Sequence, residues 1–419
     1  MKKLTLLTGL AILATSGNAQ STTKFIVTQD STNVFTILQE NAPQNPNIKD
    51  VPRFTLMGKD NKFYLGMGAN VKMVGDFDWG NPISNPNIFA PKDIPMSTDN
   101  GDHGQTLFSV GQSNIYWNFV ALPGSKNQVG LFFDIIFLGT SSKPVIEIHH
   151  LYMKYRGFTA GYVVSTFTDL KSEPKSIDFG GPNAMTLVRH PNIYYTANFG
   201  KNKMWTAQLG LDMPDVASFT TEGKASKVNQ RMPDIPFFIQ RCWADRNGWL
   251  RASAIFRDLQ YRWNSGVVDG NNGKFGWGVK LDGKTPIVGG LSACWQGVYG
   301  KGIASYIQDL SGEGLDLVLK SNNSALQTVP VWGAYGSLEY AFGKCGFINF
   351  TYSQVRSYVD QFQGYEDLYK YGQYVTSNLI FNVSSFAQVG VEYLWGKRVD
   401  YSGKKAHDNR IMLMLNVSI

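Results

Sequence analysis

The stretches AQVGVEYLWGKR (387–398) and RIMLMLNVSI (410–419) close the sequence, and both alternate strictly between apolar and polar residues. Every second residue from Ala387 to Trp395 is apolar or aromatic, and so is every second residue from Ile411 to Ile419. This period of two predicts β-strands with one apolar and one polar face. Two interpretations remain open at this point: the closing hairpin of a transmembrane barrel, in which every backbone group is paired, or the edge of a soluble sandwich.

Residues 1–19 have the pattern of a secretory signal peptide. Two lysines precede the apolar residues 4–14, and Gly17-Asn18-Ala19 forms a small-residue cleavage site. The mature chain is therefore expected to begin at Gln20. No later run approaches the ~18 consecutive apolar residues of a transmembrane helix. Such a chain is expected in the periplasm, in the medium or in a bacterial outer membrane.

Composition favours the outer membrane. Aromatic residues make up 13% of the chain and charged residues only 17%, and the 43 glycines suit closely packed strands. Three scattered cysteines give neither a disulfide framework nor metal-ligand spacing, and the five histidines contain no H-x-x-x-H pair. We therefore expect no metal and no cofactor. The net charge of +7 would favour anions in an aqueous interior, or it simply decorates loops.

Alternating runs fill residues 59–419. Residues 20–58 are polar and are expected to form a loosely ordered periplasmic segment with one short strand near 24–28. Sixteen candidate strands follow, at 61–75, 106–120, 127–138, 145–155, 157–167, 186–199, 203–213, 235–245, 248–262, 273–282, 290–309, 331–342, 346–358, 371–383, 386–398 and 409–419.

The connections between these runs fall into two classes that alternate along the chain. Long polar connections such as 76–105 and 214–234 alternate with short ones such as Arg156-Gly157. This alternation is typical of an outer-membrane barrel with short periplasmic turns and long extracellular loops. We predict an all-β fold: a transmembrane, sixteen-stranded antiparallel β-barrel in the bacterial outer membrane. Because about sixteen strands enclose an aqueous channel, the expected function is the passage of solutes.

Several motifs also resemble a known family. The segments YMKY (152–155), GFTAG (157–161), STFTD (165–169), DFGGP (178–182) and VRHPNIYYT (188–196) resemble the corresponding run of the DcaP-like trimeric outer-membrane porins. Weaker landmarks are scattered over residues 60–419. The resemblance implies a homotrimer that passes small anions such as dicarboxylates. The chain departs from the family in three ways: it lacks heptads in 20–58, it ends in isoleucine, and His149 stands where arginine is more common.

The connection from Leu170 to Leu187 occupies the place of the inward-folded loop of general porins. It is rich in glycine and proline and carries several charges, so we expect it to narrow the interior. The alternative is an ordinary solvated loop. The charged residues of this candidate constriction are Asp169, Lys171, Glu173, Lys175 and Asp178.

Strand parity predicts which charged side chains face the interior. A charge on the lipid face near the membrane centre costs about 2–4 kcal/mol, so inward placement is favoured. On 145–155 we expect Ile148 and Tyr152 to face outward. The expected inward set is Glu147, His149, Arg189, Arg251, Arg257, Lys280, Glu392, Arg398 and Arg410. Arg189 and Arg257 are the preferred anion contacts, because guanidinium forms paired bonds with carboxylates; alternatively, the whole set only solvates the wall.

Aromatic residues of outward parity are expected to form girdles at the two membrane interfaces. They are Trp277, Trp332, Tyr340, Tyr393 and Trp395. The expected partners are membrane lipid, two further copies of the chain and small anionic solutes, with no nucleic acid. Two other functions remain open: a surface adhesin, and a barrel hydrolase that pairs a serine with a histidine. The candidates for that pair are Ser109, Ser113, Ser165, His149 and His150. The sequence contains neither G-x-S-x-G nor H-E-x-x-H, and we expect no enzyme.

Overall fold

The computed structural model describes residues 32–43, 54–96, 103–140, 143–264, 271–320, 325–359 and 365–419. The predicted signal peptide and the short strand expected near 24–28 lie outside this part of the chain. Among the described residues, no helix is long and apolar enough to cross a membrane.

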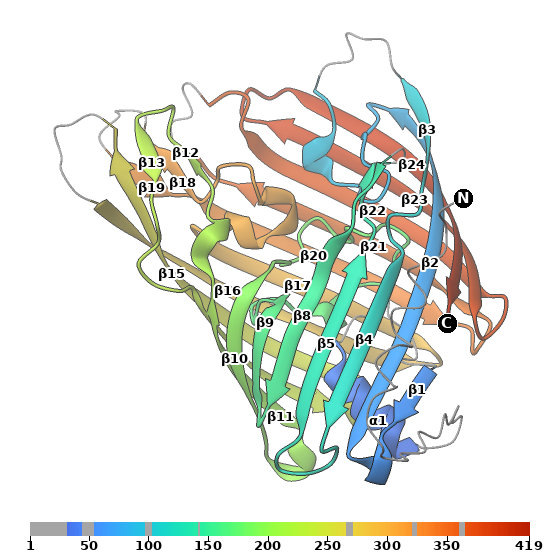
Figure 1. Ribbon diagram of the computed structural model, residues 1–419. Helices are drawn as coiled ribbons and strands as arrows, with labels where there is room; N and C mark the ends of the chain where they lie inside the picture. Colours follow the sequence, from blue (N-terminus) through green and yellow to red (C-terminus); the bar gives the residue numbers. More distant parts are fainter. Residues whose placement is uncertain are drawn as a thin grey trace, which may run out of the picture.

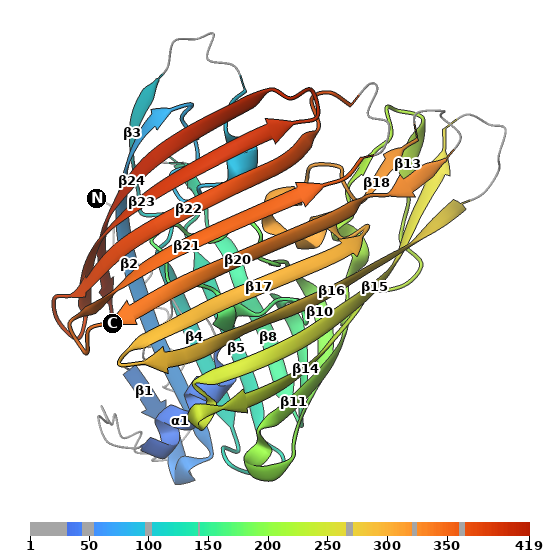
Figure 2. The same ribbon diagram turned by 180° about the vertical axis from the view of Figure 1, so that it is seen from behind.

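The fold is a closed antiparallel barrel of sixteen strands, two of which are interrupted (Figures 1 and 2). Around the ring they are β2 (Phe63–Gly80), β3 (Gly104–Ser109) with β4 (Asn114–Ala121), β5 (Val129–Ile136), β8 (Glu147–Tyr155), β9 (Phe158–Val164), β10 (Arg189–Phe199), β11 (Trp205–Asp212), β13 (Ala225–Lys227) with β14 (Ile235–Trp243), β15 (Gly248–Trp263), β16 (Asn271–Val288), β17 (Leu291–Lys301), β20 (Pro330–Ala341), β21 (Gly346–Ser357), β22 (Tyr369–Asn382), β23 (Ala387–Asp400) and β24 (Lys405–Ser418).

Pairing of the last strand with the first closes the ring. Strand β24 runs antiparallel to β2, with Met73 opposite Leu415. All sixteen predicted strands are confirmed, and the soluble sandwich is excluded because the ring has no open edge. Several boundaries were wrong: β2 continues past the predicted residue 75 to Gly80, β16 continues past 282 to Val288, and the run predicted at 290–309 leaves the wall after Lys301. The chain there turns into two 3-10 helices, η8 (Ala304–Tyr306) and η9 (Gln308–Leu310).

Short elements occupy the connections. They are β6 (Gly139–Thr140), β7 (Lys143–Pro144), β12 (Phe219–Thr220), β18 (Leu317–Leu319), β19 (Leu326–Thr328), η2 (Lys59–Asn61), η3 (Pro91–Asp93), η4 (Leu170–Ser172), η5 (Lys201–Lys203), η6 (Pro214–Val216) and η7 (Ala244–Arg246). β12, β18 and β19 form a small separate sheet near the rim. At the opposite end the turns are tight: Arg156 and Gly157 both have positive φ, the backbone of a two-residue hairpin.

The strands place apolar side chains on the outer face of the barrel and polar ones inside. On β24, Leu413 and Leu415 are about half exposed, whereas Arg410 and Met412 are fully buried. The same alternation recurs on β16, where Val279 and Leu281 lie outside. An apolar outer surface on a closed barrel is the arrangement that lipid requires, because every backbone group is paired within the sheet.

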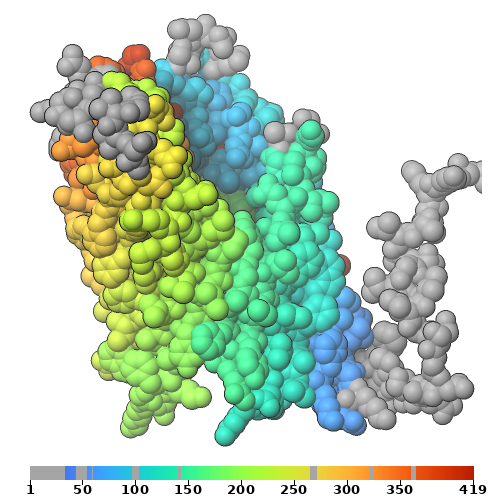
Figure 3. Space-filling view, turned by 60° about the vertical axis from the view of Figure 1, so that its left-hand side comes forward, coloured from blue at the N-terminus to red at the C-terminus, as the bar shows by residue number. Residues whose placement is uncertain are grey.

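The wall is not of uniform height. Strands β5, β8, β9 and β11 have 8, 9, 7 and 8 residues, whereas β15 and β16 have 16 and 18. The space-filling view in Figure 3 shows the consequence: a hollow opens at the rim between the yellow-green and cyan strands. The long-loop end of the barrel is therefore lower on the side of the short strands.

An N-terminal helix, α1 (Thr32–Asn41), lies inside the short-turn end of the barrel (Figure 1). Its Leu38 is fully buried, and the Asn41 amide donates to Asn118 of β4 at 2.6 Å. Tyr152 of β8 donates to the Asn41 carbonyl at 2.7 Å. A side chain at Gly130 of β5 would collide with Asn41, so this glycine makes room for the helix. The described part of residues 20–58 is therefore packed against the wall rather than loosely ordered.

Two details of this region differ from expectation. Tyr152 faces inward, not outward, because a bulge on β8 shifts its register against β5 between Asp134 and Ile135. Strand β1 (Phe54–Met57) pairs with residues 64–67 of β2, whereas β24 pairs with residues 70–80 of the same strand. There, the backbones of Ile419 and Ala69 exchange two hydrogen bonds, so β1 extends the sheet beyond the last residue of the chain.

Candidate functional site

The connection between β9 and β10, residues 165–188, folds into the barrel; we call it the inner loop. Its middle is held by Glu392 on β23, whose side chain is completely buried. Glu392 accepts hydrogen bonds from the Ser176 hydroxyl and the Ile177 amide, both at 2.5 Å, and from the Asp178 amide at 3.3 Å. One wall carboxylate thus binds three consecutive loop residues, since an ionised carboxylate can accept several donors at once.

Further contacts join the inner loop to the strands across the barrel. Tyr335 of β20 shares a hydrogen bond of 3.0 Å with the Ser172 hydroxyl. Ser353 of β21 donates to Asn183 at 2.6 Å, and Gln296 of β17 donates to the Ala184 carbonyl at 2.8 Å. The loop therefore crosses the interior and rests on the opposite wall. Its residues Phe167, Leu170 and Met185 belong to the main apolar cluster of the molecule.

The first turn of the inner loop is fixed by Asp169. Its carboxylate accepts from the Trp249 indole at 2.9 Å and lies 3.3 Å from the Arg251 guanidinium. Burial alone would raise the pKa of Asp169, but Arg251 and the hydrogen bonds hold that pKa well below its usual range. Asp169 also caps η4 by accepting from the Lys171 amide. This carboxylate is an anchor, not a free charge in the interior.

Two other connections also fold inward. Residues 81–96 place Ile83, Phe89 and Ile94 in an apolar cluster with wall residues of β22 and β24. Residues 302–319 place Tyr306 and Leu310, both fully buried, against the inner loop. The interior on the side of the long loops is therefore occupied by these three connections, which pack on one another and on the wall.

Inward-facing arginines hold these loops in place. Arg410 bonds to Asp78 at 2.6 and 2.8 Å and to the carbonyl groups of Ile83 and Asn85 at 2.8 Å. Arg398 donates to the Lys92 carbonyl in the same connection. These two predicted interior residues do lie inside, and both bind protein groups.

The charge of Arg257 is compensated in the same way. Its side chain is fully buried, lies 2.9 Å from Asp234 and 3.1 Å from Asp316, and donates to the Ser305 hydroxyl. Lys280 is also fully buried, with Asp282 at 2.7 Å. Both residues face inward as parity predicts, but their charges are compensated by neighbouring carboxylates.

Two partly exposed cations of the interior lie nearer the short-turn end. Lys175 of the inner loop and Lys284 of β16 approach the same carboxylate, Glu339 of β20, at 2.8 and 3.8 Å. Each lysine side chain keeps 25% of its surface exposed although it faces inward. Two cations therefore share one anion beside solvent-accessible space. Lys171, over the Trp249 ring, lies in the same loop, and burial lowers its pKa.

Sequence reasoning missed two members of this group. It placed Lys284 in a turn and assigned no role to Glu339. The signal was present, because Lys284 continues the inward parity of Lys280 and Asp282 on β16. The partnership with Lys175, however, joins residues more than a hundred positions apart and has no local signature.

The remaining predicted residues lie on the side of the short strands. Arg189, at the start of β10, interacts electrostatically with Glu173 of the inner loop. Burial raises the pKa of Glu173 to about 7, although Arg189 opposes the shift. His149 is buried on the inward face of β8, whereas Glu147 is exposed at the rim.

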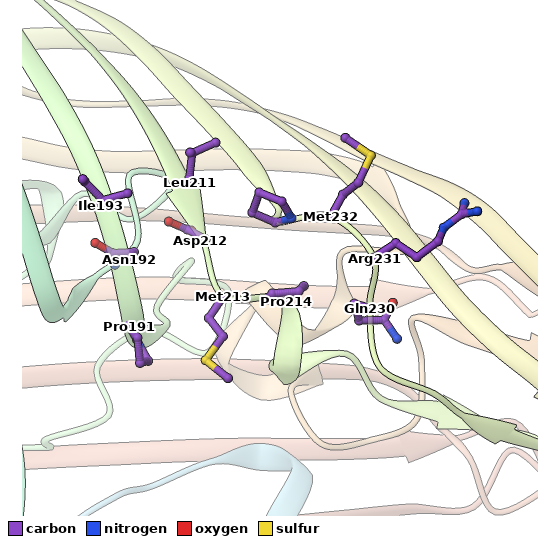
Figure 4. Close-up of a pocket in the computed structure, with 11 residues that line it drawn as sticks. Pro191, Asn192, Ile193, Leu211, Asp212, Met213, Pro214, Gln230, Arg231 and Met232 are labelled. Carbon is purple, nitrogen blue, oxygen red and sulfur yellow. The ribbon is translucent and has the colours of Figure 1, made fainter. Parts of the chain in front are cut away.

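The five candidate girdle residues lie on the outer face. Tyr340 and Tyr393 are 46% and 39% exposed, and Trp277, Trp332 and Trp395 are partly exposed. Trp277 packs edge-on against Tyr299, and Trp79 lies beside Tyr393. The outer face also carries an open groove of about 440 Å³ between β10, β11 and residues 230–233, lined by Ile193, Leu211 and Met232 among others (Figure 4). Its lining also includes the buried residues Asn192 and Asp212.

No family model matches the chain, and no curated protein matches it in sequence. Solved structures match its fold. The outer membrane channel DcaP of Acinetobacter baumannii gives a TM-score of 0.72 at 19% identity, covering 86% of this chain and 99% of that one. OmpT without loop L8, from Vibrio cholerae, gives 0.53 at 9% identity, covering 85% and 100%. OmpF of Salmonella typhi, in complex with daunomycin, gives 0.50 at 10% identity, covering 85% and 98%.

The barrel is therefore similar to those of outer membrane channels. The resemblance to DcaP-like porins, predicted from residues 152–196, is confirmed at the level of the fold. At 19% identity and below, the likeness establishes architecture, and the activity must be argued from this chain's own interior.

Proposed function

We propose that this chain is a porin of the bacterial outer membrane, through which small hydrophilic solutes diffuse passively with a preference for anions. Small carboxylates and dicarboxylates are the solute class that the family resemblance implies. The long loops would face the medium, and the short turns and α1 would face the periplasm. Because lumen charges tune which ions enter a pore, the charges around the inner loop would set selectivity.

One observation supports the anion preference above the others. Lys175 and Lys284 share Glu339 and keep a quarter of their side-chain surfaces exposed inside the wall. The group carries one uncompensated positive charge at the underside of the inner loop. Arg257, Arg398 and Arg410 already bind carboxylates or carbonyls, so we assign them to loop anchoring. Arg189 remains a candidate contact on the opposite side, beside Glu173.

The partners follow from the outer surface. Apolar side chains cover the outside of the short strands, among them Leu151 and Met153 of β8 and Leu209 of β11. The lowered wall on this side is visible in Figure 3. We propose that this side packs against two further copies in a homotrimer, which would shield the lowered rim from lipid. The girdle aromatics would anchor the rest of the circumference at the membrane interfaces.

A hydrolase is not favoured by the serines and histidines of the interior. Ser165 donates directly to Asp212 at 2.5 Å, and His190 lies 3.1 Å from the same carboxylate. A catalytic triad needs the histidine between serine and carboxylate, so that it can take the serine proton. Here the carboxylate is the shared centre, which is an anchoring arrangement. We infer that the protein is not an enzyme.

Planar-bilayer recording under a KCl gradient tests the proposal. The purified full chain should insert with conductance steps in groups of three and a reversal potential on the chloride side. A folded, heat-modifiable barrel that conducts nothing would overturn the porin proposal and favour a surface adhesin. A reversal potential on the potassium side would leave a porin but contradict the role assigned to Lys175 and Lys284.

A further inference from the structure

Three side chains with metal-ligating groups meet on the inward face of the short wall. Asp134 of β5 lies beside His149 and His150 of β8. The two carboxylate oxygens of Asp134 are each 2.9 Å from one imidazole Nδ1 atom. One ligand atom from each residue lies within 4.8 Å of the others, and all three side chains are buried.

A bulge in β8 creates this cluster. Consecutive residues of a regular strand point to opposite faces, so two adjacent histidines should not share a partner. The register shift opposite Asp134 and Ile135 turns both rings inward instead. Their positions are then fixed by aromatic neighbours: Phe132 packs edge-on against His150, and Phe179 of the inner loop lies 5.9 Å from His149.

The rings have binding capacity that the protein leaves unused. The Nε2 atoms of His149 and His150 are buried and find no hydrogen-bond partner among the described residues. No described group at Nε2 therefore fixes the tautomer of either ring. Each ring can carry its proton on Nε2, the tautomer that presents Nδ1 as a ligand.

We propose that Asp134, His149 and His150 bind one divalent transition-metal ion, with Zn²⁺ as the best fit. Each imidazole Nδ1 lies 2.9 Å from a different carboxylate oxygen of Asp134, so a small shift of the side chains would bring one oxygen and both nitrogens to zinc-ligand bonds of about 2.0 Å. Two nitrogen ligands favour zinc over magnesium or calcium, which take oxygen ligands. Three protein ligands leave the fourth position open to water or to the carboxylate of a solute.

Neighbouring charge restricts which ions can bind. Arg189, at the start of β10, places a positive charge within electrostatic range of both rings. The same charge repels cations that bind by electrostatics alone, which sharpens the preference for ions with strong bonds to nitrogen. A bound ion would add positive charge beside the inner loop, because His149 lies against Phe179 of that loop.

Equilibrium dialysis tests the site without any transport measurement. The mature chain, without a histidine tag, is folded in detergent, stripped with a chelator and dialysed against Zn²⁺ with excess Mg²⁺. About one zinc ion per chain is expected, and His150→Ala should weaken binding about tenfold or more. His190→Ala is the matched control, because His190 faces a single carboxylate, Asp212, and should leave zinc binding unchanged.

Cobalt binding gives a second readout that uses the unaltered chain, so it stays informative even if a variant fails to fold. Co²⁺ bound to the unaltered chain should show the intense visible absorption of tetrahedral nitrogen and oxygen coordination, and Zn²⁺ should displace it. Asp134→Asn keeps the side-chain shape and should weaken that absorption. The proposal is overturned if the chain binds no more zinc than His150→Ala, or if cobalt shows only the weak spectrum of its hydrated ion. Either failure leaves the porin proposal untouched.

Discussion

Glu392→Ala should release the inner loop from the wall. The side chain accepts two loop hydrogen bonds at 2.5 Å and one at 3.3 Å, and it is fully buried. Each hydrogen bond to a charged group is worth about 1.5–3 kcal/mol, so the two bonds at 2.5 Å alone make the loss of this carboxylate cost the docked loop about 3–6 kcal/mol. That change lowers the ratio of docked to undocked loop by at least about a hundredfold. Anchors at Ser172 and Asn183 remain, so the barrel itself should persist.

Three readouts follow the loop in the Glu392→Ala protein. Single-channel conductance should rise, liposome swelling should admit larger sugars, and trypsin should cleave after Lys175 in the folded barrel. Glu147→Ala is the matched control, because Glu147 is an exposed carboxylate at the rim of β8. Unchanged conductance, size limit and trypsin resistance in a folded Glu392→Ala barrel would refute the assignment of this loop as the constriction.

Three further outcomes are expected. Gly130→Ala should displace α1, at a cost of about 1–3 kcal/mol for overpacking, and expose it to limited proteolysis, whereas Gly336→Ala, with open space around it, should not. Anion preference should fall from pH 6 to pH 8, because Glu173, whose pKa burial raises to about 7, is neutral below that pH and negative above it; Glu173→Gln should flatten the profile of reversal potential against pH. Arg257→Ala should lower the heat-modification temperature, because it leaves buried carboxylates unpaired at a cost of about 3–5 kcal/mol. Arg231→Ala, at an exposed ion pair, should not.

The alternation in the sequence predicts the closed barrel, because a chain that spans a membrane with strands must pair every backbone group within a closed sheet. A wall that faces lipid on one side and a polar interior on the other must alternate along every strand. The pattern gave the wrong end for the run at 290–309, because apolar residues such as Ile303, Ile307 and Leu310 continue after the strand stops. Those residues are buried against the inner loop instead of lipid, and periodicity alone does not separate the two environments.

The helix α1 shows a different limit. Its buried residues Val34 and Leu38 are spaced four apart, which is a helical signal, but one turn of apolar residues is weak. The contact that decides its position is the Asn41 side chain in the space left by Gly130. No local pattern links two residues so far apart in the chain.

Parity predicted the face of the interior charges but not their partners. Arg257 and Arg410 do point inward, yet carboxylates and carbonyl groups from the wall and from inward-folded loops surround them. Which loops fold inward depends on tertiary packing, and the sequence marked only residues 170–187. The sequence predicts no metal at the histidines 149 and 150, because metal motifs are recognised by spacing along one element. Their ligand set combines two strands and a bulge.

The reversal potential of the Lys175→Gln, Lys284→Gln double variant, measured beside the unaltered chain under the same KCl gradient, tests the central claim most directly. The unaltered chain should reverse on the chloride side. The double variant should shift toward or past zero, because it leaves Glu339 as the uncompensated charge below the inner loop. Identical reversal potentials for the two proteins would contradict this account of how the interior selects anions.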